Sequence, residues 1–251
     1  MRRKLAAVAL LAAFGLGMIP VESALDARQR AAGLRSAALD LSLRERVGQM
    51  GFLAALSGFR SPLAAILWIQ AHTAWERTEW GRMAALFDTV TTLQPRSLTY
   101  WDMAAWHMAW NASVAALDDK SVQSEALRQR NQRQYFELGR DILERGIRNN
   151  PESGFLYERL GILLRDKFED HCGAARAFAR AAELPGVMPY VARFAGYELA
   201  KCPGHEREAY EKLRALYLKG ENERLPTLLT ILEEMENKLA IPDSERVVSP
   251  H

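Results

Sequence analysis

The chain has 251 residues, of which 49% are apolar and 25% are charged, and its formal net charge is +2. This composition excludes a wholly disordered chain and indicates one globular domain or one repeat array. The near balance of charge, without a long basic run, disfavours a nucleic-acid-binding protein.

The first 21 residues differ from the rest of the chain. Three basic residues at positions 2 to 4 precede an uncharged stretch from Leu5 to Val21. This order is typical of a secretory signal peptide, and the stretch is also just long enough for a short membrane-spanning helix. Residues 1–21 are therefore predicted to be a signal peptide or an N-terminal membrane anchor. In both cases the positive-inside rule places the following chain on the non-cytoplasmic side of the inner membrane, in the cell envelope.

Residues 22–60 are predicted to be a helical segment near the membrane. The stretch from Gly51 to Phe59 is unusually apolar for a linker. It is predicted to pack as a cap on the first unit of a helical array, because the ends of such arrays need to be covered. The alternative is that it dips into the membrane interface.

The remaining chain shows helical periods and almost no strand pattern. Apolar residues recur at spacings of three and four, and short breaks with Gly or Pro separate most segments. One helix is predicted to begin at Ser61-Pro62, and another is predicted to end at Gln94-Pro95. Further helices are predicted over 98–110, 124–149, 153–168, 173–184, 188–201, 205–219 and 222–239. Residues 241–251 are predicted to be a flexible tail.

Three prolines indicate a repeat of helical hairpins. Pro95, Pro151 and Pro185 each follow a pair of predicted helices, and Pro151 and Pro185 are 34 positions apart. Pro95 and Pro151 are 56 positions apart, which equals 34 plus an insertion of 22. We place this insertion at about 112–133.

The unit between Pro151 and Pro185 carries a recognisable motif. Its first helix holds an aromatic residue, a Leu-Gly pair and a second large residue, and its second helix alternates small and aromatic residues. With this pattern the chain resembles the tetratricopeptide repeat family over about 61–219, as a degenerate member of the bacterial envelope type. The residues that carry the resemblance are Tyr157, Glu158, Arg159, Leu160, Gly161, Leu164, Ala174, Phe178, Ala181 and Leu184, then Trp101, Ala104, Ala105 and Met108, and more loosely Leu67, Ala71, Phe87, Val90, Pro95, 194–199 and 209–216.

The resemblance implies an all-α fold, a right-handed α-solenoid of stacked hairpins over residues 61–240. Each hairpin has too little apolar surface to fold alone, so the stack has to bury it. Residues 222–239 carry leucines and a methionine on one stripe, which predicts a helix that caps the C-terminal end of the solenoid. A hydrophobic helix is predicted at the N-terminal end.

All six tryptophans lie between Trp68 and Trp110. In the resembling family, the first helices of successive units line a groove that holds a partner peptide. Aromatic anchors with a few charges suit such a groove. The alternative, which we favour slightly because aromatic stripes usually lie in cores, is that these rings fill the core. The candidate partner-binding residues are Trp68, His72, Trp75, Asp102, Trp106, Trp110, Glu158 and Arg165.

Motifs for catalysis are absent from the sequence. It has no Gly-rich phosphate loop, no Gly-x-Ser-x-Gly elbow and no Cys-x-x-Cys pair. His205 and Glu206 begin like a zinc-protease helix, but Ala209 stands where the second His is required. We therefore expect no enzymatic activity, no cofactor, no metal and no small-molecule substrate.

Two cysteines, Cys172 and Cys202, lie at the turns of successive predicted hairpins. The favoured interpretation is that they pack as separate small residues, and a disulfide in an oxidising compartment is the alternative. A metal site with His171 and His205 is disfavoured, because the spacing matches no zinc motif.

The sequence thus predicts a non-enzymatic scaffold, tethered at the cell envelope, that binds segments of other proteins in an aromatic-rich groove. The alternative is a membrane-associated accessory subunit that packs its Trp-rich half on an integral membrane protein.

Overall fold

The computed structural model describes residues 58–248, which belong to one compact unit. Every regular element in this part of the chain is helical. The predicted leader at 1–21 and the segment at 22–57 lie outside the described residues. Among the described helices, none has the length and apolar character needed to cross a bilayer.

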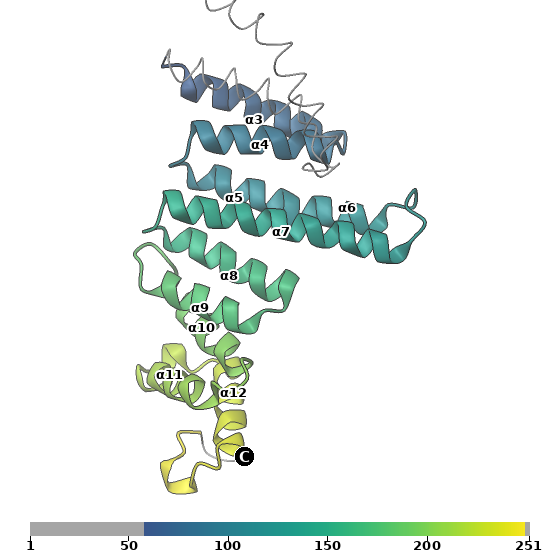
Figure 1. The fold of residues 1–251 in the computed structure, drawn as a ribbon. Helices are drawn as coiled ribbons and strands as arrows, with labels where there is room; N and C mark the ends of the chain where they lie inside the picture. Colours follow the sequence, from purple (N-terminus) through teal and green to yellow (C-terminus); the bar gives the residue numbers. More distant parts are fainter. Residues whose placement is uncertain (1–57, 249–251) are drawn as a thin grey trace, which may run out of the picture. The chain divides into compact units, whose positions relative to one another are not determined.

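The described helices pair into hairpins that stack one after another (Figure 1). This arrangement confirms the predicted all-α solenoid. The first hairpin is α3 (Arg60–Glu76) with α4 (Trp80–Leu93), and the second is α5 (Leu98–Trp106), a π-helical turn η1 (His107–Ala112) and α6 (Ser113–Asp118) with α7 (Glu125–Asn149). The third is α8 (Gly154–Phe168) with α9 (His171–Ala182), and the fourth is α10 (Tyr190–Ala200) with α11 (Glu206–Leu218), followed by η2 (Glu221–Glu223), α12 (Pro226–Lys238) and η3 (Asp243–Glu245).

Side-chain caps explain several helix starts. The side chains of Ser124, Ser153 and Asp170 each accept a hydrogen bond from the backbone N–H three residues later. Such a cap satisfies one of the free N–H groups at a helix start. The cap at Asp170 starts α9 two residues earlier than predicted. Pro226 occupies the first turn of α12, so the predicted start at 222 is wrong.

Glycines let the two helices of a hairpin approach closely. A Cβ atom on Gly161 of α8 would lie 2.7 Å from the Phe178 ring of α9, and one on Gly146 of α7 would lie 2.9 Å from the Trp101 ring of α5. Both rings are fully buried. The Leu-Gly pair and the following aromatic residue therefore interlock as the repeat resemblance implies.

The turns at the ends of the first and second hairpins are joined by hydrogen bonds. The carbonyl oxygen of Pro95 accepts from Trp101 Nε1 at 3.0 Å and from Asn150 Nδ2 at 2.8 Å. Arg96 also donates to the carbonyl of Asn149. These bonds fix the stacking of the two hairpins at one edge.

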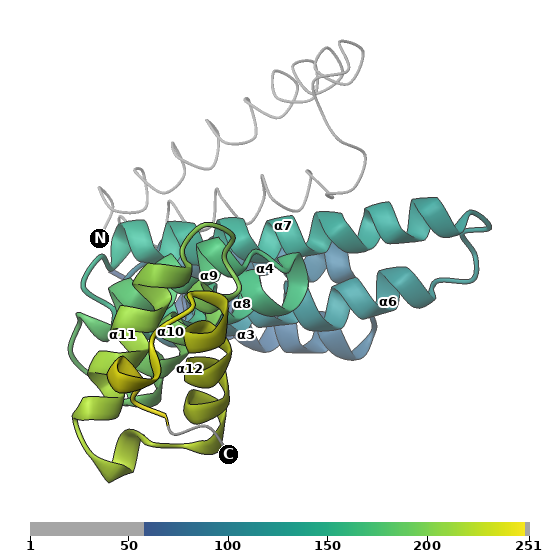
Figure 2. The same ribbon diagram turned by 90° about the horizontal axis from the view of Figure 1, so that it is seen from below.

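The insertion predicted at about 112–133 lengthens both helices of the second hairpin. The helix predicted to end at Trp110 continues through η1 and α6 to Asp118, so the predicted end is wrong. Figure 2 shows α6 and the first half of α7 running together beyond the other helices. α6 packs against α7, so the continuation past Trp110 has a partner helix along its length.

The C-terminal residues pack back on the array. Leu228, Leu232 and Met235 of α12 are buried, as is Ile241 after it. The backbone N–H of Val247 donates to Glu236 Oε1 at 2.8 Å. The capping role of α12 is therefore as predicted, whereas the predicted free tail is wrong for 241–248.

Candidate functional site

A cavity of about 410 Å³ lies between the first helices of the second and third hairpins. Trp106 and Asp166 are exposed, so the cavity opens to the surface. Its walls come from α5 with η1 on one side and from α8 on the other, and Leu143 of α7 completes the lining. The full lining is Asp102, Met103, Ala105, Trp106, Trp110, Leu143, Arg159, Ile162 and Asp166.

The charged groups of this cavity are paired with one another or with close neighbours. Arg159 Nε lies 3.2 Å from Asp102 Oδ1, although the N–H direction leaves this buried nitrogen without an aligned hydrogen bond. Burial raises the pKa of Asp102, and Arg159 opposes that shift. Asp166 Oδ1 accepts from Arg165 Nε at 2.6 Å. The cavity therefore combines mainly apolar walls with balanced charges.

A cluster of aromatic rings surrounds His107, next to the cavity. The centroid of the His107 ring lies 5.1 Å from Trp106, 5.6 Å from Trp75, 5.6 Å from Phe87 and 6.2 Å from His72. Trp75 belongs to α3 and Trp106 to α5, so the cluster joins the first helices of two hairpins. We call the cavity with Trp106 and Trp110 in its wall the aromatic groove.

His107 is the buried centre of this cluster, with only 2% of its surface exposed. Nδ1 lies 3.0 Å from the side-chain amide nitrogen of Asn111, with which it forms a hydrogen bond. Nε2 has no hydrogen-bond partner among the described residues. His107 also begins the π-helical turn η1, a deviation that is frequent at functional sites.

Burial, with a smaller contribution from His72, lowers the pKa of His107 to about 4 from 6.5. The unfolded chain therefore binds more protons than the folded one between these values, and stability falls as the pH drops from 6.5 towards 4. The gap corresponds to about 3 kcal/mol. We expect urea unfolding followed by circular dichroism to show this loss in the wild type. The His107→Phe variant should lack this part of the slope, and an identical slope in both proteins would contradict the prediction.

Some of the tryptophans lie at the surface, as groove residues would, and others fill the core. Trp75 and Trp106 are 36% and 42% exposed, and Trp110 is half-buried in the cavity wall. Trp68 is also half-buried and packs on Phe87 and Tyr100, with ring centroids 5.3 and 4.9 Å apart. Trp106 and Trp110 thus lie at the groove, Trp75 is exposed beside His107, and Trp68 is largely packing.

The other predicted partner-binding residues also lie partly at the cavity and partly away from it. His72 is exposed on α3, and Asp102 lines the cavity. Glu158 and Arg165 do not line the cavity, which corrects the predicted positions on α8. Glu158 is 6% exposed and accepts from Tyr190 at 2.5 Å, and Arg165 lies over the Phe194 ring at 5.2 Å.

The groove on α8 is formed instead by Arg159, Ile162 and Asp166. Arg159 and Asp166 each follow a predicted residue, Glu158 or Arg165, by one position. Ile162 follows Glu158 by four positions, which is about one turn of the helix. The register of α8 in the stack, which the sequence does not show, decides which side of the helix faces the cavity. His107 was also missed, because a lone histidine beside a tryptophan carries no sequence signal of burial.

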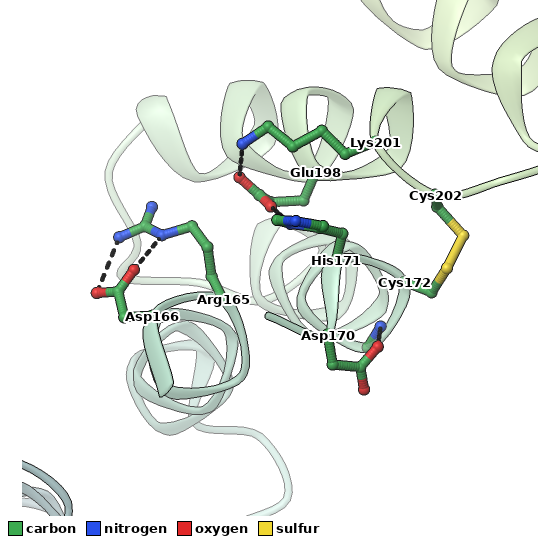
Figure 3. A network of polar contacts seen from close by, with 9 residues as sticks. Arg165, Asp166, Asp170, His171, Cys172, Glu198, Lys201 and Cys202 are labelled. Carbon is green, nitrogen blue, oxygen red and sulfur yellow. Dashed lines mark hydrogen bonds and ion pairs between the residues drawn. A yellow bond between two sulfur atoms is a disulfide. The ribbon is translucent and has the colours of Figure 1, made fainter. Parts of the chain in front are cut away.

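The two cysteines form a disulfide, with their Cα atoms 5.0 Å apart (Figure 3). The favoured interpretation as separate packed residues is therefore wrong. The bond joins the start of α9 to the turn after α10, and Cys202 packs with Ala175, Leu199 and Ala209. With both thiols bonded, neither is available as a thiolate ligand. Among the described residues, no group of three His, Cys, Asp or Glu is arranged to hold a metal ion.

Polar contacts accompany the disulfide. Glu198, whose side chain is almost fully buried, is 2.7 Å from His171 Nδ1 and 3.1 Å from Lys201 Nζ (Figure 3). The contact with His171 joins the same two elements, α9 and α10, and the contact with Lys201 is local to the end of α10. This part of the molecule is thus a cross-linked joint between hairpins rather than an open site.

No protein-family model matches the sequence, and no curated protein matches it. A comparison with solved structures finds a thermophilic tetratricopeptide repeat protein of Thermus thermophilus, with 14% identity over 79% of this chain and 100% of that one, and a TM-score of 0.39. At this score the match carries no weight of its own. The chain resembles tetratricopeptide repeat proteins through its stacked hairpins and the glycine contacts between their helices.

Proposed function

We propose that this chain is a protein-interaction scaffold that binds a segment of a partner protein in the aromatic groove, without catalysing a reaction. The observation that carries the proposal is the cavity with Trp106 and Trp110 in its wall, between the first helices of two hairpins. Large aromatic residues left at a surface are the usual anchors of protein interfaces.

The chemistry of the cavity supports binding better than catalysis. The carboxylate of Asp102 lies against Arg159, and that of Asp166 lies against Arg165. A general base needs a free lone pair aimed at its substrate. Carboxylates that lie against arginines instead hold the walls of the groove in place.

The proposal includes a location at the cell envelope, on the non-cytoplasmic side of a membrane. The apolar stretch after the basic residues at positions 2 to 4 supports export. The disulfide between Cys172 and Cys202 supports it independently, because such bonds persist mainly in oxidising compartments. The mature N-terminus, read by mass spectrometry, tests whether the leader is cleaved or retained as an anchor.

Site-specific photo-crosslinking in living cells tests the groove. A photoreactive residue at Met103 or Ile162, both in the cavity wall, should capture a partner protein. The same residue at Arg176, which is exposed on α9, is the matched control and should not. Equal capture from both positions, or from neither, would overturn the proposal.

The double variant Trp106→Ala and Trp110→Ala should weaken the captured complex at least tenfold. Loss of a buried aromatic anchor typically costs about 2 kcal/mol or more of binding free energy. The control is Leu218→Ala, which removes an apolar side chain that is 58% exposed on α11. Quantitative pull-down of the identified partner measures the difference, and unchanged recovery with the double variant contradicts the groove as the binding surface.

A second candidate function is that of an accessory subunit of a membrane protein. The favouring observation is the exposed apolar side of the first hairpin, where Phe59, Ile66 and Ile69 are all more than half exposed. Such a patch is typical of an interface. If this surface packs on a membrane protein, the chain should remain in a detergent-solubilised complex after the leader is removed. Ile66→Ser with Ile69→Ser should then release it, and a complex that persists excludes this surface.

A further inference from the structure

The outer side of α3 exposes large apolar residues. The buried residues of this helix are mostly small, namely Ala64, Leu67, Ala71 and Ala74. The larger Ile66 and Ile69 are 53% and 65% exposed, and Phe59, just before the helix, is 63% exposed. A helix that is apolar on all sides is normally buried on all sides. The outer side of α3 therefore needs a cover that the described residues do not supply.

Charge is almost absent from this part of the chain. From Val47 to Trp75, Arg60 is the only charged residue in the sequence. The exposed side of α3 thus carries no ion that would keep it in water, and the residues just before the helix carry none either. Two neighbouring apolar surfaces of this kind are most stable when each buries the other.

The turn before α3 indicates where the preceding chain goes. Gly58 has a φ of +75°, and a Cβ atom there would meet nothing within 4 Å. Glycine is therefore needed for its backbone conformation and not for space. A glycine with positive φ commonly follows the last residue of a helix. Only Gly58 and Phe59 separate the preceding residues from α3, and such a short loop is typical of two antiparallel helices.

The apolar residues on the two sides of this turn match in spacing. Three of them precede the turn at intervals of three and three follow α3's start at the same intervals, as Met50, Leu53, Leu56 and Leu63, Ile66, Ile69. A reversal of the chain at residues 58–59 places Leu53 opposite Ile66, with one further pair on either side. Rows of residues three apart form ridges through which helices pack.

We propose that residues 47–57 form a helix that packs antiparallel on the outer side of α3, with Leu53 against Ile66. The inference goes beyond the proposed function, which concerns the groove. It gives the cap predicted from the sequence a surface, a direction and a register. Because a short turn ties this segment to α3, its effective concentration at the surface far exceeds that of a separate partner. A membrane protein that used the same side of the first hairpin would have to displace it.

Thiol accessibility in the full chain, purified in detergent micelles, tests the proposal. The Ile69→Cys variant should react with a polar maleimide at least about tenfold more slowly than Leu218→Cys, because its thiol is reached only when the contact opens. Leu218 is the matched control, since it is 58% exposed on α11. The native cysteines are bonded to each other and do not react. Equal rates for the two variants would show that the side of α3 is open and would overturn the proposal.

A second background identifies what covers α3. The apolar residues before the turn are replaced together, as Met50→Ser, Leu53→Ser and Leu56→Ser. In this background the Ile69→Cys thiol should react as fast as the Leu218→Cys thiol. A slow rate that persists would show that the micelle or a second copy covers the surface, which also overturns the proposal.

A disulfide cross-link tests the register without removing the contact. In the variant Leu53→Cys with Ile66→Cys, oxidation by copper phenanthroline should join the two positions within one chain, because a disulfide forms only over a short Cα distance. Peptide mapping by mass spectrometry without reductant detects this bond. Leu53→Cys with Leu218→Cys is the control and should form none. Absence of the bond in the first pair overturns the assigned contact, and linked dimers of the single variant Ile66→Cys would show that a second copy is the occupant instead.

The groove is tested separately, by photo-crosslinking from Met103 and Ile162. If the cross-link on α3 fails while capture from the groove succeeds, this contact is wrong and the scaffold function stands. If capture fails while the cross-link forms, the scaffold function is wrong and the cover of α3 stands.

Discussion

Replacing Trp101 with alanine should lower the free energy of unfolding by about 3–5 kcal/mol, the usual cost of removing a large aromatic side chain from a core. Trp101 is only 2% exposed, and its ring lies directly over Gly146. Arg145 of α7 also lies over this ring, with its guanidinium carbon 5.6 Å from the ring centre, and removal of the indole leaves a cavity. The indole also donates to the carbonyl of Pro95, which would lose that bond.

Urea unfolding followed by circular dichroism measures this effect. Trp106→Ala is the matched control, because it removes the same side chain from the same helix at a position that is 42% exposed, and it should cost much less. Trp101→Phe should lie between the two, since it keeps a ring over Gly146 but loses the hydrogen bond to Pro95. A loss below about 1 kcal/mol in Trp101→Ala would show that this contact does not hold the second hairpin together.

Removing the disulfide should lower the free energy of unfolding by about 3–4 kcal/mol, the value expected for a closed loop of this size. Cys172 and Cys202 are 30 residues apart, and the bond connects the third hairpin to the fourth. Without it, the unfolded chain gains conformational freedom. The folded state keeps the contacts of Glu198 with His171 and Lys201, so the joint should still form.

The test compares the wild type with the double variant Cys172→Ala and Cys202→Ala, each with and without dithiothreitol. The reductant should destabilise the wild type to the level of the variant and should leave the variant unchanged. If the wild type unfolds at the same urea concentration with and without dithiothreitol, the predicted stabilisation by the disulfide is wrong. Such a result would also remove one of the two supports for an oxidising compartment.

The helices were predictable because their signals are local. Prolines and glycines end most of the helices close to the predicted residues, and the caps at Ser124, Ser153 and Asp170 use side chains that are visible in the sequence. The spacing of Pro151 and Pro185 indicated the hairpin unit. The second hairpin was harder, because no local signal at Trp110 shows that a partner helix will support a continuation to Asp118.

The candidate site was predictable only in part. Trp75, Trp106 and Trp110 were singled out from their spacing. Trp106 and Trp110 line the cavity, and Trp75 lies beside it against His107, but their role in binding stays a prediction. The α8 side was misplaced because a rotation of one residue about a helix axis, about 100°, turns a different face towards the neighbour.

By itself, the sequence determined that the chain forms helical hairpins, where most of them begin and end, and that its aromatic residues are concentrated in the first half. These properties follow from local backbone preferences and from the spacing of apolar residues. Only the tertiary structure decided that His107 is buried with an unpartnered nitrogen, that Arg159 and Ile162 face the cavity, and that the two cysteines are bonded. Each of these depends on how one hairpin is placed against the next, which is set by packing between residues that are distant in the chain.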